Sequence, residues 1–243
     1  MASRKDQKEQ LRRERIEREA AARAGERRRR MIGYGAGLAL VIAALVVGVV
    51  LLSGGDGGGG GGGGNRAADS NVLPDGGEAP QQSVDDLDQA VGAAGCEVTS
   101  KRATSREHTE DLAEQITYES NPPTSGKHFA APKDDGSYET APDVKELVHS
   151  LEHGRVVIWF KKSLPEEARA GLQALFEEDD YHLLLAPNET DMPFDVAASV
   201  WTIDPQPNGT GRMLGCPKYS PRVFDALRTF RDEYRDNGPE NVP

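Results

Sequence analysis

The chain has 243 residues, and its 40 Asp and Glu outnumber its 29 Lys and Arg, so its formal net charge is −11 at pH 7. This acidic excess repels nucleic acid and excludes a nucleic-acid-binding function. There are only two cysteines, Cys96 and Cys216, and they lie too far apart in sequence to form a Cys-x-x-Cys redox motif.

The chain begins with a basic segment followed by an apolar one. Residues 1–30 hold 12 Lys and Arg against 6 Asp and Glu, whereas residues 31–52 hold no charged residue. At about 1.5 Å per residue, the apolar segment is long enough to span the roughly 30 Å hydrocarbon core of a bilayer. Because Lys and Arg resist translocation, we predict a cytoplasmic N-terminal tail and one uncleaved transmembrane helix in the cell membrane. The alternative, a cleaved signal peptide, lacks a clear small-x-small cleavage site.

Residues 53–90 are predicted to be a disordered linker. Glycine fills nearly all of residues 54–64, and the following residues are polar with scattered proline and glycine. Residues 91–243 are then predicted to form a globular extracytoplasmic domain, which is long enough for one hydrophobic core. Residues 31–243 hold 17 Lys and Arg against 34 Asp and Glu, so this part of the chain is strongly acidic and attracts cations.

Both cysteines follow the predicted transmembrane helix and would therefore lie in an oxidising compartment. We predict a disulfide between Cys96 and Cys216, which closes a long loop. The loop-entropy argument gives a stabilisation of about 4–5 kcal/mol. The alternative is two free, buried thiols.

The domain is predicted to be α+β or small α/β. Its first part, to residue 152, is irregular and rich in Pro, Gly and His. A β-α-β-β-α core then follows, whose first β-α-β unit is predicted to be a right-handed parallel crossover. The expected elements are a strand at 156–160, a helix capped by Ser163, and strands at 181–186 and 196–203. A final helix is expected to be capped by Ser220, to begin at Pro221 and to end before Gly238.

Four of the five histidines fall within 46 positions of the irregular part: His108, His128, His149 and His153. If residues 143–153 form a helix that Asp143 caps and Gly154 ends, His149 and His153 share one face, one turn apart. This spacing suits two ligands of one metal ion. His128 follows a loop that two prolines and a glycine constrain, and such a loop can aim a side chain.

The sequence resembles the bacterial domain-of-unknown-function 3105 family over roughly residues 95–240. The matching stretches are Tyr118–His128, Gly136-Ser137-Tyr138, Val148–Gly154 and Gly238-Pro239-Glu240. Lys127 stands where the family often has proline, but His128 is in place. The resemblance implies a membrane-anchored envelope protein and supplies no activity, cofactor or partner.

The histidines predict a metal site as the first functional hypothesis. We expect His128, His149 and His153, together with His108, to bind Cu or Zn, because imidazole suits both ions. Met192 or Met213 would add a thioether ligand suited to Cu(I). On this hypothesis the ring nitrogens of His128, His149 and His153 should converge within about 3–5 Å of one another.

Two other hypotheses stay open. His149-x-x-Glu152-His153 matches the inverted zincin pattern of a zinc hydrolase, in which Glu152 acts as general base and Glu233 is a candidate third ligand. Gly154 and a strand follow this pattern at once, so the sequence favours a protein that is not an enzyme. The third hypothesis is a metal-free interaction or structural module of the envelope that binds a protein partner.

Overall fold

The computed structural model describes residues 72–240. The predicted tail at 1–30, the predicted transmembrane helix at 31–52 and the glycine-rich part of the predicted linker lie outside the described residues. Within residues 72–240, none of the helices has the length and apolar character needed to cross a membrane. The chain divides into two units after Asn65, and the description below concerns the described residues of the second unit.

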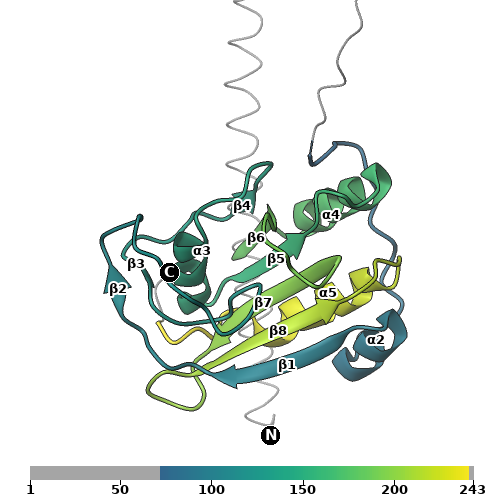
Figure 1. Cartoon of the computed structure of the whole chain (residues 1–243). Coiled ribbons are helices and arrows are strands. Elements are labelled where there is room, and N and C mark those ends of the chain that lie inside the picture. Colours follow the sequence, from purple (N-terminus) through teal and green to yellow (C-terminus); the bar gives the residue numbers. More distant parts are fainter. Residues whose placement is uncertain (1–71, 241–243) are drawn as a thin grey trace, which may run out of the picture. The chain divides into compact units, whose positions relative to one another are not determined.

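The described part is a mixed α+β domain (Figure 1). Its helices are α2 (Leu87–Ala94), α3 (Val144–Glu152), α4 (Glu166–Glu178) and α5 (Val223–Tyr234). Its longer strands are β1 (Glu97–Arg102), β5 (Val156–Phe160), β6 (Leu183–Pro187), β7 (Val196–Thr202) and β8 (Thr210–Cys216). Three strands of two residues each complete it: β2 (His108–Thr109), β3 (His128–Phe129) and β4 (Gly136–Ser137).

Six of the strands form one mixed sheet in the order β1-β8-β7-β5-β6-β4. Strands β5 and β6 pair in parallel with α4 between them in the chain, which confirms the predicted parallel connection. Strand β7 pairs antiparallel with both β5 and β8, and β8 pairs antiparallel with β1. The predicted core order lacked β8, which lies between β7 and the edge strand β1.

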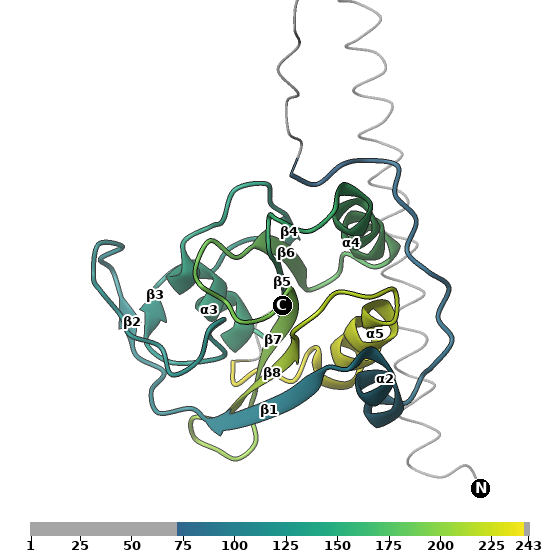
Figure 2. The same cartoon turned by 45° about the vertical axis from the view of Figure 1, so that its right-hand side comes forward.

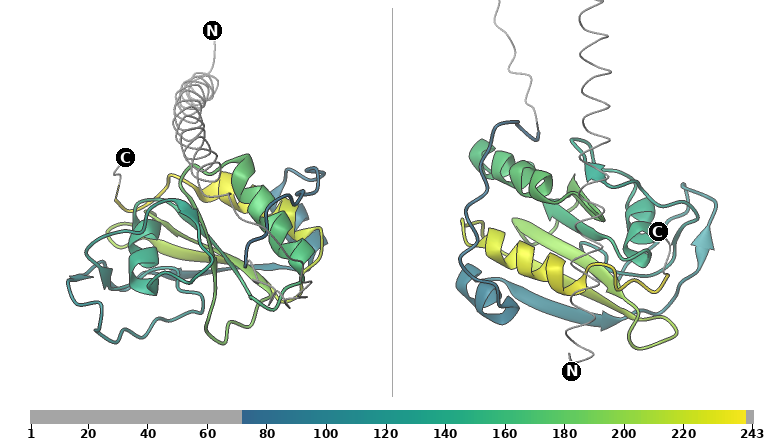
Figure 3. Two further views of the ribbon diagram at one scale, coloured as in Figure 1. Left: turned by 90° about the horizontal axis from the view of Figure 1, so that it is seen from above. Right: turned by 180° about the vertical axis from the view of Figure 1, so that it is seen from behind.

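The sheet is buried on both faces. Successive residues of β5 alternate between two hydrophobic clusters, so that Ile158 packs in the first and Val157 and Trp159 pack in the second. The first cluster includes side chains of α2, α4 and α5, and the second includes three side chains of α3. The helices therefore cover opposite faces of the sheet, with α3 alone on its side (Figure 3). Burial on both faces explains why the central strands are continuous apolar runs.

Several predicted boundaries are wrong. The linker predicted to reach residue 90 includes packed residues, because Leu73 is 5% exposed in the first cluster and α2 begins at Leu87. Ser163 is not the N-cap of α4, because that helix begins at Glu166 after Pro165, which makes no side-chain capping bond. Ser220 is likewise not the N-cap of α5, because that helix begins at Val223 after Arg222.

The predicted disulfide between Cys96 and Cys216 is present, and neither cysteine is free. It joins the residue before β1 to the last residue of β8, across the register pair Glu97–Gly215. The bond therefore fastens the edge strand to its one neighbour in the sheet.

The segment between β1 and α3 is largely irregular, as predicted. Its two short strands β2 and β3 pair in parallel beside α3, on the side of the sheet away from α2, α4 and α5 (Figure 2). His108 lies on β2, His128 on β3 and His149 in the last turn of α3, and His153 is the C-cap of that helix.

Candidate metal centre

The pairing of β2 with β3 brings His108 and His128 together. The two residues are register partners, and His128 N donates to the carbonyl oxygen of Glu107 at 3.0 Å. Neighbouring residues of a parallel pair present their side chains on the same face. The two imidazole rings accordingly lie with their centroids 4.5 Å apart.

Helix α3 supplies the other side of the site. Asp143 caps it by accepting from Lys145 N, and Gly154, with a φ of +81°, follows its end, both as predicted. Glu152 stands three residues after His149 and His153 four residues after it, so all three project from the same side of the helix. His149 Nδ1 donates to the carbonyl oxygen of Phe129 at 2.7 Å, which ties α3 to β3.

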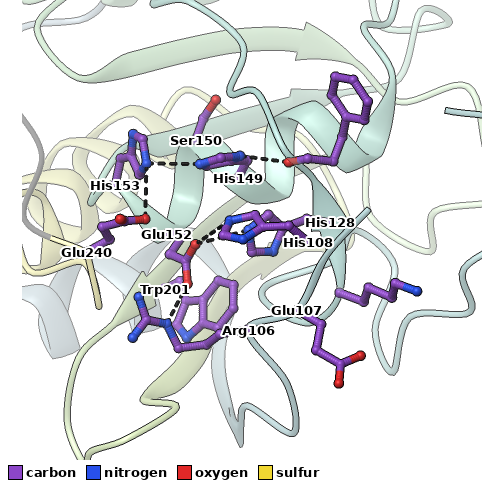
Figure 4. A network of polar contacts seen from close by, with 12 residues as sticks. Arg106, Glu107, His108, His128, His149, Ser150, Glu152, His153, Trp201 and Glu240 are labelled. Atoms are coloured by element: carbon purple, nitrogen blue, oxygen red, sulfur yellow. Dashed lines mark hydrogen bonds and ion pairs between the residues drawn. The ribbon is translucent and has the colours of Figure 1, made fainter. Parts of the chain in front are cut away.

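One group of four side chains can hold a metal ion, and we call it the inner group: His108, His128, His149 and Glu152. One ligand atom from each lies within 4.8 Å of the others, and the three ring centroids are 4.5–4.9 Å apart (Figure 4). Atoms bound to one ion at 2.0–2.1 Å lie about 3.3 Å apart in a tetrahedron, so closure requires movements of under about 1 Å per atom. Only His108 is exposed.

A pair of buried atoms in the inner group lacks hydrogen bonds. His128 Nδ1 lies 2.7 Å from the carbonyl oxygen of Gly126, which can only accept, so Nδ1 carries a proton. In the neutral ring, Nε2 then presents its lone pair to Glu152 Oε2, 3.0 Å away. Neither atom has a hydrogen-bond partner among the described residues, and both side chains are 0% exposed. A metal ion placed between the two atoms would contact both of them.

The surroundings keep the carboxylate charged and one ring neutral. Burial raises the pKa of Glu152, but His128 and Arg106 lower it more strongly, so its pKa falls to about 2. Arg106 Nε donates to the other oxygen, Glu152 Oε1. Burial lowers the pKa of His149 to about 4, so this imidazole is unprotonated at neutral pH, as a metal ligand must be.

A second set of side chains, which we call the outer group, consists of His149, His153 and Glu240. His149 Nε2 and His153 Nε2 are 3.0 Å apart, and His153 Nε2 is 3.4 Å from Glu240 Oε2 (Figure 4). The carboxylate beside His149 and His153 is therefore that of Glu240 and not that of Glu233, which was the predicted candidate for the third ligand. Glu233 is exposed on α5 and belongs to neither group.

The C-terminal segment reaches the outer group by crossing the end of α3. Asp236 N donates to the carbonyl oxygen of Gly154, and Glu240 N donates to that of Glu152. A Cβ on Gly238 would lie 2.2 Å from Gly154 N and 2.4 Å from Glu152 O. Only glycine at 238 permits this approach, so the Leu-Glu-His-Gly and Gly-Pro-Glu stretches are joined in space.

The structure divides the predicted metal ligands between the two groups. His108, His128 and His149 come together, whereas His153 reaches them only through its contact with His149. Met192 and Met213 pack in the second hydrophobic cluster. His182, which was not a predicted ligand, pairs instead with Asp236.

The sequence analysis did not predict three residues of the site: Glu152 in the role of a ligand, Arg106 and Glu240. Glu152 had a signal, because its spacing from His149 puts both on one helix face. Glu240 stood in a family-matched stretch, but nothing in the sequence indicated that this stretch meets α3. Arg106 had no signal. The hydrolase hypothesis is not favoured, since Glu152 faces Arg106, His108 and His128 rather than a site between His149 and His153.

Comparison with known proteins gives one match. The family described as "Protein of unknown function (DUF3105)" matches residues 108–242, a span that includes every residue of the inner and outer groups. No curated protein and no solved structure matches the chain significantly.

Proposed function

The chain belongs to the DUF3105 family, whose description names no activity, and we propose from its own site that it binds one copper(II) or zinc(II) ion in the inner group. The ligands are His108, His128, His149 and Glu152. Three neutral imidazoles and one carboxylate form a donor set that both ions accept.

The observation that carries this proposal is the buried pair of His128 Nε2 and Glu152 Oε2. The two atoms are 3.0 Å apart and shielded from water, and Glu152 Oε2 also lies 3.5 Å from His108 Nε2. Two imidazole nitrogens therefore converge on one buried carboxylate oxygen, as ligands of a single ion do. A metal ion bound between them would contact all three atoms at once.

The supporting contacts are those of a preorganised metal site. Two of the ligand rings are oriented by backbone carbonyls: Gly126 O holds His128 Nδ1, and Phe129 O holds His149 Nδ1. Arg106 orients the carboxylate of Glu152 from the opposite side. Such contacts on the far side of the ligands fix which nitrogen faces the ion and typically change affinity 10- to 100-fold when removed.

We further propose that this domain is held at the outer face of the cell membrane. Residues 31–52 would span the bilayer once, with residues 1–30 in the cytoplasm and a glycine-rich linker between helix and domain. The acidic surroundings of the domain would raise the local concentration of cations outside the cell. A protein partner for delivery or receipt of the ion fits this arrangement.

Titration calorimetry with the full-length chain, purified in detergent, tests the metal site. We expect one Cu(II) or Zn(II) per chain, and loss of this binding when His128→Ala is combined with His149→Ala. His182→Gln is the matched control, because His182 is a buried histidine outside both groups. Absence of binding at micromolar copper and zinc would refute the proposal and favour a metal-free envelope module.

A further inference from the structure

We infer that His149 is shared between two alternative positions of a single metal ion, and that the outer group is the position through which the ion enters the inner group. This inference rests on the proposed metal binding. It assigns His153 and Glu240 a role in the rate at which the metal ion binds. The final bound state uses neither residue.

The two groups cannot hold two ions at once. His149 Nδ1 is occupied by its hydrogen bond to Phe129 O, so only Nε2 has a lone pair to offer. That nitrogen lies 3.0 Å from His153 Nε2. Because Nδ1 is engaged with Phe129 O, Nε2 is also the nitrogen that His149 has left for the inner group. One lone pair binds one ion, so occupation of either group empties the other.

The ligands on the two sides of His149 differ in number and exposure. The outer group offers two imidazoles and the carboxylate of Glu240, whose side chain is 41% exposed. The inner group offers three imidazoles and Glu152, which is 0% exposed. Coulomb attraction to a carboxylate is stronger away from water, so the ion is held more tightly inside. The inner group also meets solvent at His108, whose side chain is 45% exposed, so the test below separates entry past His108 from entry through the outer group. An ion captured at the weaker outer position moves from there to the stronger inner one.

The transfer is a ligand exchange in which the ion never leaves His149. The bonds from the ion to His153 Nε2 and Glu240 Oε2 break, and bonds to His128 Nε2 and Glu152 Oε2 form. His108, at the exposed side of the inner group, then completes the coordination.

A position on the path changes rates without changing the final affinity. Replacing His153 or Glu240 should therefore slow metal binding and metal release by the same factor, because the bound state itself uses neither residue. Replacing an inner ligand should instead weaken the affinity. This difference separates a loading position from an additional ligand.

The test is stopped-flow fluorescence with Cu(II) supplied as its glycine complex to the full-length chain. Trp201 reports on the inner group because its ring centroid lies 5.8 Å from that of His128, and bound Cu(II) quenches nearby indole emission. The variants are His153→Gln, which keeps a donor beside His149, and Glu240→Gln. Glu233→Gln is the matched control, an exposed glutamate outside both groups.

We expect each variant to lower the association and dissociation rates on the order of tenfold, with Kd unchanged within about twofold and one ion per chain. Unchanged rates would overturn the inference and point to direct entry past His108. A weakened Kd would overturn it by making His153 or Glu240 a ligand of the final site. Binding of two ions per chain would refute the inference that both positions use His149 Nε2. In all three cases the wild type still binds copper, whereas failure of the proposed function would leave the wild type without bound copper.

Discussion

The smallest unit that explains the site is the chain of contacts Arg106–Glu152–His128. Arg106 compensates the charge of a fully buried carboxylate on one oxygen, and the other oxygen is left facing His128 Nε2. A buried carboxylate needs charged partners, since isolated ions lose several kcal/mol when they leave water. The Arg106 guanidinium binds one carboxylate oxygen of Glu152, Oε1, and the position of the other oxygen, Oε2, suits contact with a bound cation.

Arg106→Gln should destabilise the metal-free protein and should do so less when zinc is present. Without the guanidinium the Glu152 charge is poorly compensated, and we expect a loss of about 1–3 kcal/mol, limited because the Arg106 side chain is 33% exposed. A bound ion supplies positive charge to the same carboxylate. Urea denaturation with and without zinc measures both losses.

Arg102→Gln is the matched control for this prediction, because Arg102 is an exposed arginine at the end of β1. We expect the control to lose little stability in either condition. Equal losses for Arg106→Gln with and without zinc would mean that no ion contacts Glu152.

At the scale of single residues, the sequence predicted the part of the site that local spacing determines. His149 and His153 lie one turn apart because Asp143 and Gly154 fix the ends of a short helix, and all of this can be read from neighbouring positions. The partition of the histidines into two groups depends on which ring faces which carboxylate. Glu240 lies 87 positions after His153, so no local pattern could join them.

At the scale of elements, the site depends on the crossing of the C-terminal segment over the end of α3. The hydrogen bonds at Gly154 and Glu152 hold that segment, and the absence of a side chain at Gly238 lets it approach. The outer group is therefore assembled from two elements that meet at a pair of glycines.

Gly238→Ala should separate these two elements. An added Cβ would lie 2.2 Å from Gly154 N, and backbone atoms on both sides leave it no flexible neighbour to displace. We expect a destabilisation of about 1–3 kcal/mol, as for overpacking in a core, together with slowed copper loading as in Glu240→Gln. The urea denaturation midpoint and the stopped-flow association rate measure the two effects.

Gly92→Ala provides the comparison, since a Cβ at this glycine of α2 meets nothing within 4 Å. Alanine also favours helix over glycine, so this variant should be as stable as the wild type or more so. If Gly238→Ala behaved in the same way, the close crossing would be refuted.

Sequence patterns predicted the central strands and missed the outer ones for a physical reason. Strand β5 was predicted to the residue because all five of its side chains are buried. Strand β1 is an edge strand with mostly exposed side chains, and β8 contains two glycines and an arginine. Neither has the apolar run or the clean alternation that marks a strand, and only pairing with a neighbour in the fold makes them strands.

At the scale of the whole molecule, the proposed topology places the metal centre outside the cell. The expectation comes from the charge difference across residues 31–52, with 12 basic residues on one side and a strongly acidic chain on the other. This topology would make the inner group accessible to metal ions in the envelope and would separate it from the cytoplasm.

Protease treatment of spheroplasts that carry a differently tagged chain tests this topology. We expect an N-terminal tag to survive external protease and a C-terminal tag to be digested, because only the domain after residue 52 faces outward. Lysis before treatment should expose both tags to digestion. Loss of the N-terminal tag from intact spheroplasts, or survival of the C-terminal tag, would contradict the proposed orientation.

The disulfide has a consequence for neighbouring copies of the chain. Strand β1 contacts the sheet through β8 alone, and a terminal edge strand of this kind is the part of a fold most readily exchanged between two molecules. The bond between Cys96 and Cys216 lies at the first residues of that pairing and, once formed within a chain, opposes such a swap. In an oxidising compartment, each copy would therefore keep its own edge strand even when many copies are crowded side by side on one membrane.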